Sequence, residues 1–502
     1  MFKLSIRFIF LSILISGFLI LTPQGVGSQW NGHSTKYIIL LIGDGMGSNH
    51  LLAANSYTGL KPDYQEDQTW RSAWISTFPY VGTYDPNFAW QTFDYVTKDS
   101  ITDSAAAATA LYTGVKTVNG RISMGASSDV RLKAITEFAR EKGFAVGAVT
   151  TTPISHATPA AWIAHNDSRN NGYAIADEGL WGNPNTTGTP FDSSFYEGSH
   201  GTTMPPIDVL IGGGNPAWFT LGNHFVNSNM VTKLKQEADQ VGTFHYVERV
   251  SGKSDGGNRL LEEAQKTETT RLVGLFGGTN GDIEYRLADN SGANAENPTL
   301  PEMALAALTV LEKNPCGFIL LIEGGTIDHA SHANNMNEMI GEVIDFNQTV
   351  QTVVDWVEDP RNDPTWENTL VIVTADHETG YLAQAPGVFA NQSLGEVSPW
   401  TVVLEKKVLP DGPVASWDDV NDNNEIEIGE SVYWAWNSTG HTNSLVPIFV
   451  RGAGSERLDQ FIRGVDPIRG FYLDNTDVFG LMRSALGYTE YLPIIFANAI
   501  NH

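Results

Sequence analysis

Short, almost wholly apolar runs recur along this chain, and they constrain its fold more than any other feature. Such a run is typical of a strand buried on both faces, as in a parallel sheet covered by helices. The runs are YIILLI (37–42), AVGAVT (145–150), DVLIGG (208–213), RLVGLF (271–276), FILLIE (318–323), TLVIVT (369–374) and VPIFVR (446–451). Because helical stretches separate many of them, the sequence predicts an α/β fold with a large, mainly parallel central sheet flanked by helices on both faces.

The stretch TLPEMALAALTVLEKN, which begins at Thr299, is a predicted helix with a clear start. Thr299 and Glu302 have the spacing of a capping box, and Pro301 falls in the first turn, where proline is tolerated. Two other stretches, about 170–205 and 381–436, interrupt the alternation of strands and helices and are rich in Gly, Asn, Asp, Trp and Ser. We expect them to be insertions on one core rather than linkers between domains.

The N-terminus has the pattern of an export signal. Two basic residues precede an apolar stretch at 8–21, and small residues up to Ser28 offer a cleavage site. We therefore expect a signal peptide at 1–28, a single domain at 29–502, and a periplasmic or secreted protein with no membrane attachment after cleavage. An uncleaved anchor is the alternative, but the apolar stretch is short for a membrane span.

Charge and cysteine content exclude several classes of function. The formal net charge is −27, so no basic surface exists to hold a nucleic acid as a stable partner. Cys316 is the only cysteine, which excludes disulfides within the chain and metal clusters built from thiolates. It precedes an apolar run and is most simply a buried structural residue.

Polar residues with metal-binding chemistry follow four of the predicted strands. Ligands bind outside the carboxyl ends of strands in open α/β sheets, so side chains gathered there point to a site. Any one such residue alone would more often have a structural role, but several at neighbouring strand ends indicate a binding site. The residues are Asp44 after the first run, His156 and Thr158 after the second, Glu323 and Asp328 after the fifth, and Asp376 with His377 after the sixth.

Two pairs within this set have the spacing of metal ligands. Asp328 and His332 stand four apart, so a helix that begins near Thr326 would present both on one face. A helix cap beside an unrelated histidine is the alternative for this pair. Adjacent Asp376 and His377 at a strand end can hold a second ion.

Two further candidates are weaker by themselves. Asp44 lies between glycines in GDGMG, where the backbone can approach a ligand closely, although an ordinary Asx turn explains it equally well. His441 lies in STGHTNS just before the last apolar run, and alone it would more often be a loop histidine.

The segment ITDSAAAATA, residues 101–110, has two readings. Asp103 or Ser104 followed by alanines is typical of a capped helix. A serine at a helix N-terminus also lies at the positive end of the helix dipole, where a phosphate binds well, so Ser104 is a candidate nucleophile.

Taken together, the motifs resemble those of alkaline phosphatases in order and spacing, over nearly the whole mature chain. They are LIGDGMG, TDSAAAATA with TGVKT, HATPAAWIAHNDSR, IDVLIGGG, LPEM, IEGGTIDHASHANN, TADHETG and STGHTNSLVPIFVRG. The resemblance implies two zinc ions and one magnesium ion, with ligand types that suit them. It assigns Asp328, His332 and His441 to one zinc; Asp376, His377, Asp44 and the Ser104 oxygen to the second; and Asp44, Thr158 and Glu323 to magnesium.

The resemblance also implies the reaction, which is hydrolysis of small phosphate monoesters through a covalent phosphoserine on Ser104. Arg169 would hold the non-bridging phosphate oxygens, because its planar fork matches two of them at once. His156 and His329 vary within the family; here His156 would orient water at the third metal and His329 would reach phosphate through water. A homodimer is expected, in which the 381–436 insertion forms a crown-like projection near the interface between the subunits.

The segment DVNDNNEIEIGE, residues 419–430, has oxygen side chains at the spacing of a calcium loop. Asn424 replaces the usual glycine, but asparagine tolerates the left-handed conformation needed there. An acidic, solvated loop is the alternative. The candidate ligands of a structural calcium ion are Asp419, Asn421, Asn423, Glu425 and Glu430.

Two rival functions fit parts of the sequence. A phosphodiesterase or sulfatase of the same superfamily would use a similar metal site. Arg169 and the third metal set favour a monoesterase, since both address charge that a diester lacks. A calcium-binding surface protein without activity, built around 381–436, would leave Ser104, Arg169 and the residues at the strand ends unexplained.

Overall fold

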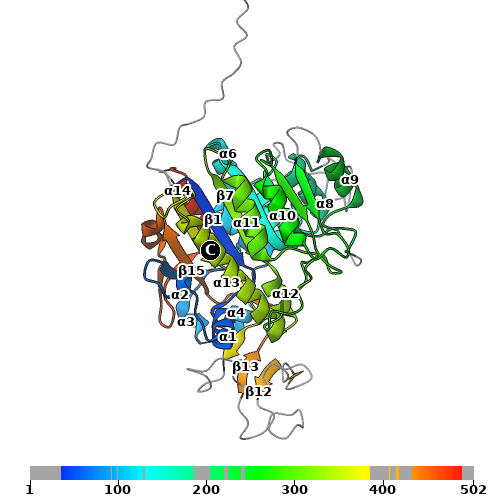
Figure 1. The fold of residues 1–502 in the computed structure, drawn as a ribbon. Coiled ribbons are helices and arrows are strands. Elements are labelled where there is room, and N and C mark those ends of the chain that lie inside the picture. The colour runs from blue at the N-terminus through cyan, green and yellow to red at the C-terminus, as the bar shows by residue number, and fades with distance from the viewer. Residues whose placement is uncertain are drawn as a thin grey trace, which may run out of the picture.

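A sheet of eleven strands forms the centre of the protein (Figure 1). The structure is a computed structural model, and it describes residues 35–488 apart from 92, 99, 128–129, 185–186, 188–203, 220–223, 239–243, 385–405, 408–413 and 418–431. In spatial order the strands are β16 (Gly464–Asp466), β17 (Gly470–Asp474), β2 (Arg71–Ser76), β15 (Val446–Gly452), β8 (Thr369–Thr374), β1 (Tyr37–Gly43), β7 (Phe318–Gly324), β3 (Ala145–Pro153), β4 (Val209–Gly213), β6 (Leu272–Leu275) and β5 (His245–Glu248).

All seven predicted strands lie in this sheet, and most neighbouring pairs are parallel. β1 lies near the middle, pairs in parallel with β7 and β8, and is buried along its whole length. β15 is an exception, because it runs antiparallel to both β8 and β2. The predicted mainly parallel α/β sheet is therefore confirmed, with an antiparallel strand inside it.

The helices form two layers. In one, α1 (Ser48–Thr58), α10 (Gly256–Gln265), α11 (Leu300–Leu311) and α13 (Met336–Glu358) pack in a chain of neighbours. In the other, the neighbours are α5 (Ser104–Thr113), α6 (Ile135–Glu141), α7 (Ala157–Ile163), α8 (Gly172–Trp181) and α14 (Thr476–Ala485). The remaining helices are α2 (Asp63–Glu66), α3 (Pro86–Ala89), α4 (Phe93–Thr97), α9 (Ser228–Glu237), α12 (Thr326–His332) and the 3₁₀ helix Ser455–Phe461.

The start of α11 is the capping box predicted from the sequence. The Thr299 hydroxyl accepts a hydrogen bond from the Glu302 backbone N–H, and the Glu302 carboxylate accepts one from the Thr299 backbone N–H. Replacing Thr299 by alanine is expected to lower the free energy of unfolding by about 1 kcal/mol, because one helix N–H loses its partner. Urea denaturation checks this, with Thr299→Ser as the control that keeps the hydroxyl and should behave like the unsubstituted chain.

The two stretches that interrupt the alternation differ in what they form. Within 170–205, α8 is a mostly buried helix that packs against α7. Within 381–436, the described residues form a separate sheet in the order β10 (Leu382–Gln384), β13 (Val432–Trp436), β12 (Val414–Trp417) and β11 (Lys406–Lys407). The expected signal peptide and the 419–430 loop lie outside the described residues. None of the described helices is both long and apolar enough to cross a membrane.

Candidate metal centre

Four adjacent strands, β8, β1, β7 and β3, bring most of the predicted metal ligands to one edge of the sheet. The four strands are parallel and end together, and each carries or is followed by at least one ligand. His441 is the exception, because it lies on β14 (His441–Thr442), outside the central sheet. Among the described residues, three groups of His, Asp and Glu have ligand atoms within 4.8 Å of one another. They are Asp328 with His332 and His441, Asp44 with Asp376 and His377, and Asp44 with His156 and Glu323.

In the first group, two imidazoles face each other beside a carboxylate. α12 begins at Thr326, as predicted, and presents Asp328 and His332 together, with His332 Nε2 3.3 Å from Asp328 Oδ2. His332 Nε2 lies 2.9 Å from His441 Nε2. The Nδ1 atoms of both rings donate to carbonyls, of Thr439 at 2.6 Å and of Thr102 at 2.9 Å. The two Nε2 lone pairs therefore point at each other, and a shared proton or a cation relieves their repulsion.

The second group surrounds Ser104. His377 Nε2 lies 3.2 Å from Ser104 Oγ, 3.2 Å from Asp376 Oδ2 and 3.5 Å from Asp44 Oδ1. All four side chains are buried. Burial and the neighbouring histidine His441 lower the pKa of His377 well below its usual value, so its ring is neutral. A neutral ring among carboxylate oxygens has a lone pair available for a cation.

The third group is richer in oxygen. Glu323 accepts hydrogen bonds from the hydroxyls of Thr150 at 2.5 Å and Thr152 at 3.5 Å. Thr158, in the first turn of α7, donates to Asp44 Oδ2 at 3.3 Å. Asp44 thus belongs to both the second and the third group, as a bridging ligand would.

Unsatisfied carboxylate oxygens are the strongest sign of a cation at this edge. Asp44 Oδ1, Asp376 Oδ2 and Glu323 Oε1 are buried and make no hydrogen bond to the described residues. Burial raises the pKa of each of these three carboxyl groups, and for Asp44 the nearby charge of Asp376 raises it further. Leaving such oxygens unpaired is costly, whereas metal ions use them as ligands. The residues present therefore fit bound divalent cations.

Of the two interpretations of the segment at 101–110, the structure confirms the capped helix. Asp103 is the N-cap of α5, and its Oδ1 accepts from the Ala106 N–H at 2.9 Å. Ser104 is the first helical residue, so the cap leaves its hydroxyl free to face His377. The structure consequently places this hydroxyl at the positive end of a buried ten-residue helix, beside the second group.

Arg169 reaches this site from the loop after α7. Its Nη1 donates to Asp103 Oδ2 at 3.1 Å and its Nη2 lies 3.3 Å from His156 Nε2. Asp103 therefore fixes both the start of α5 and the guanidinium. The sequence indicated the capping role of Asp103 but not this second one.

His329 lies beside His156, with the ring centroids 5.4 Å apart and the rings nearly perpendicular. Its Nδ1 is 2.9 Å from Asp282 Oδ2. Burial lowers the pKa of His329, but the Asp282 carboxylate outweighs burial and raises this pKa to about 9. For His156, burial and the charge of Arg169 both act in the same direction and lower the pKa well below its usual value. The two histidines thus differ in charge at neutral pH.

Two residues of this site escaped prediction. Asp282 follows the strand β6, so the rule of polar residues at strand ends applied to it as well. Thr379 lies two residues after His377 and donates to Asp328 Oδ1 at 2.5 Å. No strand pattern marks it, because β9 covers only Glu378–Thr379 and does not include His377.

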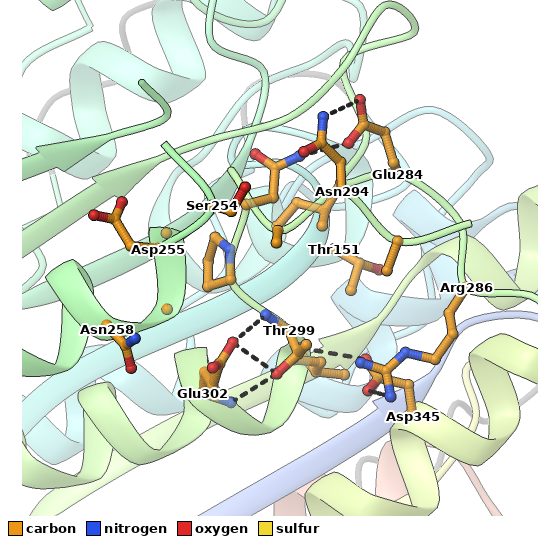
Figure 2. Close-up of a pocket in the computed structure, with 18 of the residues that line it drawn as sticks. Thr151, Ser254, Asp255, Asn258, Glu284, Arg286, Asn294, Thr299, Glu302 and Asp345 are labelled. Atoms are coloured by element: carbon orange, nitrogen blue, oxygen red, sulfur yellow. Dashed lines mark hydrogen bonds and ion pairs between the residues drawn. The ribbon is translucent and has the colours of Figure 1, made fainter. Parts of the chain in front are cut away.

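A cavity of about 210 Å³ lies among α10, α11 and α13 and is lined partly by Thr151 of β3 (Figure 2). Its carboxylates already bond to groups of the chain: Glu302 to Thr299, and Asp345 to Arg286 at 2.9 Å. None of the three groups of candidate metal ligands found among the described residues includes them. We therefore assign the metal centre to the strand ends alone.

Comparison with known proteins identifies the family of this chain. The family profile described as alkaline phosphatase matches residues 35–488. Alkaline phosphatase 4 of Bacillus subtilis (strain 168) is 28% identical over 479 residues, covering 89% of this chain and 90% of the relative. Alkaline phosphatase of Escherichia coli (strain K12) is 31% identical over 381 residues, covering 70% and 72%.

Solved structures support the fold. Alkaline phosphatase from the Antarctic bacterium TAB5 has a TM-score of 0.57 and 22% identity, covering 91% of this chain and 100% of that one. The enzyme from Thermus thermophilus has a TM-score of 0.60 and 22% identity, covering 92% and 93%. The family match, the fold and the gathered ligands agree: this chain belongs to the alkaline phosphatase family.

Proposed function

We propose that this chain hydrolyses phosphate monoesters by a metal-dependent route in which Ser104 is transiently phosphorylated. The observation that carries the proposal is the position of the Ser104 hydroxyl. It lies 3.2 Å from His377 Nε2, at a helix N-terminus, beside buried carboxylate oxygens that make no hydrogen bond. Membership of the family supports the substrate class, and the geometry supports the route.

The donor chemistry supports zinc in the first two groups and magnesium in the third. Carboxylate with one or more histidines is a typical zinc ligand set, and the first two groups consist of these residues. The third group also contains a histidine, His156, but the hydroxyl of Thr158 adds to the carboxylate oxygens of Asp44 and Glu323, and oxygen ligands suit Mg²⁺. A histidine-to-aspartate variant of the TAB5 alkaline phosphatase was solved with Mg bound in its M3 site.

The chain's own residues then divide the work of the reaction. Ser104 loses its proton to solvent, its Oγ attacks phosphorus, the ester P–O bond breaks, and the leaving oxygen takes up a proton from water as the alcohol departs. Water later attacks the phosphoserine, its P–O bond to Ser104 breaks, and Ser104 Oγ regains a proton as phosphate is released. Arg169 binds the non-bridging oxygens with the N–H groups that Asp103 and His156 do not occupy. When bound, the ions lower the pKa of the attacking oxygen and stabilise charge on the departing one.

His156 and His329 complete the phosphate side of the proposal. A neutral His156 orients water at the third group, and His329, held by Asp282, contacts phosphate through water. Three broader features are proposed as well. Assembly as a homodimer rests on the resemblance, export of the mature chain rests on the pattern of the N-terminus, and a structural calcium ion at 419–430 rests on the spacing of oxygen side chains there.

Trapping the covalent intermediate tests the route. The metal-loaded protein is incubated with a radiolabelled phosphate monoester, quenched with acid and digested. We expect the label on the peptide that contains Ser104. Label on a different peptide, or none during active turnover, would contradict the proposed nucleophile.

Replacing Arg169 by lysine is expected to weaken inhibition by inorganic phosphate about 10-fold, because a point charge cannot make two parallel hydrogen bonds. Zinc and magnesium content should stay the same, since Arg169 is not in any of the three ligand groups. Inhibition assays with metal analysis check both expectations. Unchanged phosphate inhibition would count against the assigned role.

A further inference from the structure

One side chain contacts the first and the second ligand group at once. The hydroxyl of Thr379, on β9 (Glu378–Thr379), lies 2.5 Å from Asp328 Oδ1 in the first group and 3.3 Å from His377 Nδ1 in the second. Thr379 is fully buried, so water does not replace these contacts.

The direction of these hydrogen bonds follows from the donors available. An ionised carboxylate only accepts, so the Thr379 hydroxyl gives its single proton to Asp328. The contact with His377 then needs the Nδ1–H of the ring as donor to the Thr379 oxygen. The proton of His377 is thereby held on Nδ1, and its Nε2 is left bare toward Ser104 and Asp376.

The backbone holds Thr379 in this place. β9 pairs with β14 (His441–Thr442), and His441 is directly opposite Thr379 in the register. The Thr379 N–H donates to the Gly45 carbonyl at 3.0 Å. Gly45 has φ +71°, and a Cβ there would lie 2.8 Å from both Thr379 Oγ1 and Asp328 Oδ1, so its lack of a side chain makes room for the contact.

We propose that Thr379 is a positioning residue that couples the two zinc positions, by fixing the tautomer of His377 and the orientation of Asp328 with one hydroxyl. This inference rests on the proposed function, because it takes the first two groups to be zinc sites. Partners that orient a ligand typically change metal affinity 10- to 100-fold when they are removed. Loss of this hydroxyl should therefore weaken both zinc sites together, although it is a ligand of neither.

Zinc affinity of three variants tests the proposal. Metal-depleted protein is titrated with zinc in competition with a chromophoric chelator, which gives the affinity without any measurement of activity. Thr379→Val keeps the shape and removes the hydroxyl, and we expect both zinc sites to weaken roughly 10- to 100-fold. Thr379→Ser restores the hydroxyl and should bind zinc within about 3-fold of the unsubstituted chain.

A matched control removes a buried hydroxyl elsewhere. Thr349 on α13 is fully buried and donates only to the Asp345 carbonyl, so Thr349→Val should leave zinc affinity unchanged. Equal zinc binding by Thr379→Val and the unsubstituted chain would overturn the coupling role and leave the proposed function intact. A loss in Thr379→Ser as large as in Thr379→Val would also overturn it. Failure of the unsubstituted chain to bind two zinc ions would overturn the proposed function as well.

Discussion

Replacing Ser104 by alanine is expected to lower kcat/KM for a phosphate monoester on the order of 10⁴-fold, because the reaction loses its nucleophile. The loss should appear in kcat rather than in KM, since Arg169 and the metal ions held by the ligand groups, which attract the anionic substrate, would remain. The rest of the site should be little disturbed, because Asp103 and not Ser104 supplies the cap of α5. Steady-state kinetics on the metal-loaded protein measure the loss.

The matched control is Ser123→Ala. Ser123 is equally buried, but its hydroxyl donates to the Ala161 carbonyl and it belongs to none of the ligand groups. The Ser123→Ala variant should have a lower free energy of unfolding and an unchanged kcat. If Ser104→Ala retained a tenth or more of the activity, the phosphoserine route would be wrong, whatever the metal content.

Replacing Asp44 by asparagine is expected to change activity and stability in opposite directions. Activity should fall by at least about 10³-fold, because Asp44 is shared by two ligand groups. In the metal-depleted protein, however, the buried Asp44 carboxyl has a pKa raised by burial and by Asp376. An isosteric amide removes that strain, so the free energy of unfolding at pH 8 should rise by about 1–3 kcal/mol.

The dependence on pH has a definite sign. A carboxyl group with a raised pKa in the folded state binds its proton more tightly there than in the unfolded chain. Below the usual carboxyl pKa of about 4, the group is protonated in both states and the shift does not change the free energy of unfolding. As the pH rises above that value, the unfolded chain loses the proton first and the folded state loses stability. In chelator, the increase in the free energy of unfolding caused by Asp44→Asn should therefore grow with pH. When zinc and magnesium are added, Asp44→Asn should instead lower the free energy of unfolding.

Denaturation by urea at several pH values, with and without chelator, measures this difference. Asp459→Asn is the control, because that exposed carboxylate pairs with Arg71 at the surface and should change stability by less than about 0.5 kcal/mol. Destabilisation of the metal-depleted protein by Asp44→Asn would contradict this explanation. It would mean that the unpaired carboxylate oxygen of Asp44 does not lower the stability of the protein when no cation is bound.

The central strands were predictable because their burial leaves a plain pattern. β1, β7 and β8 are buried along their whole length, and their residues are apolar or small except for the threonines of β8 and Glu323 near the end of β7. In β2 the first two residues are exposed, so buried and exposed residues do not form a plain pattern. The strands β5 and β16 are short and only partly buried. Those strands carry no continuous apolar run, and the sequence alone did not reveal them.

The site was predictable to the extent that it follows strand ends. Asp44, Glu323 and Asp376 come directly from the alternation of strands and polar residues, and the spacing of Asp328 and His332 from the period of a helix. Contacts between distant segments left no such pattern. Asp282 meets His329 across 47 positions in the sequence, and Thr379 meets Asp328 across 51.

Metal-dependent hydrolysis of phosphate monoesters is measured most directly with p-nitrophenyl phosphate beside bis(p-nitrophenyl) phosphate at alkaline pH. Hydrolysis of each ester is followed before chelation, after chelation, and after zinc and magnesium are restored. We expect turnover of the monoester that is lost with the metals and returns with them, and little turnover of the diester. Preference for the diester, or monoester turnover that survives complete chelation, would contradict this expectation.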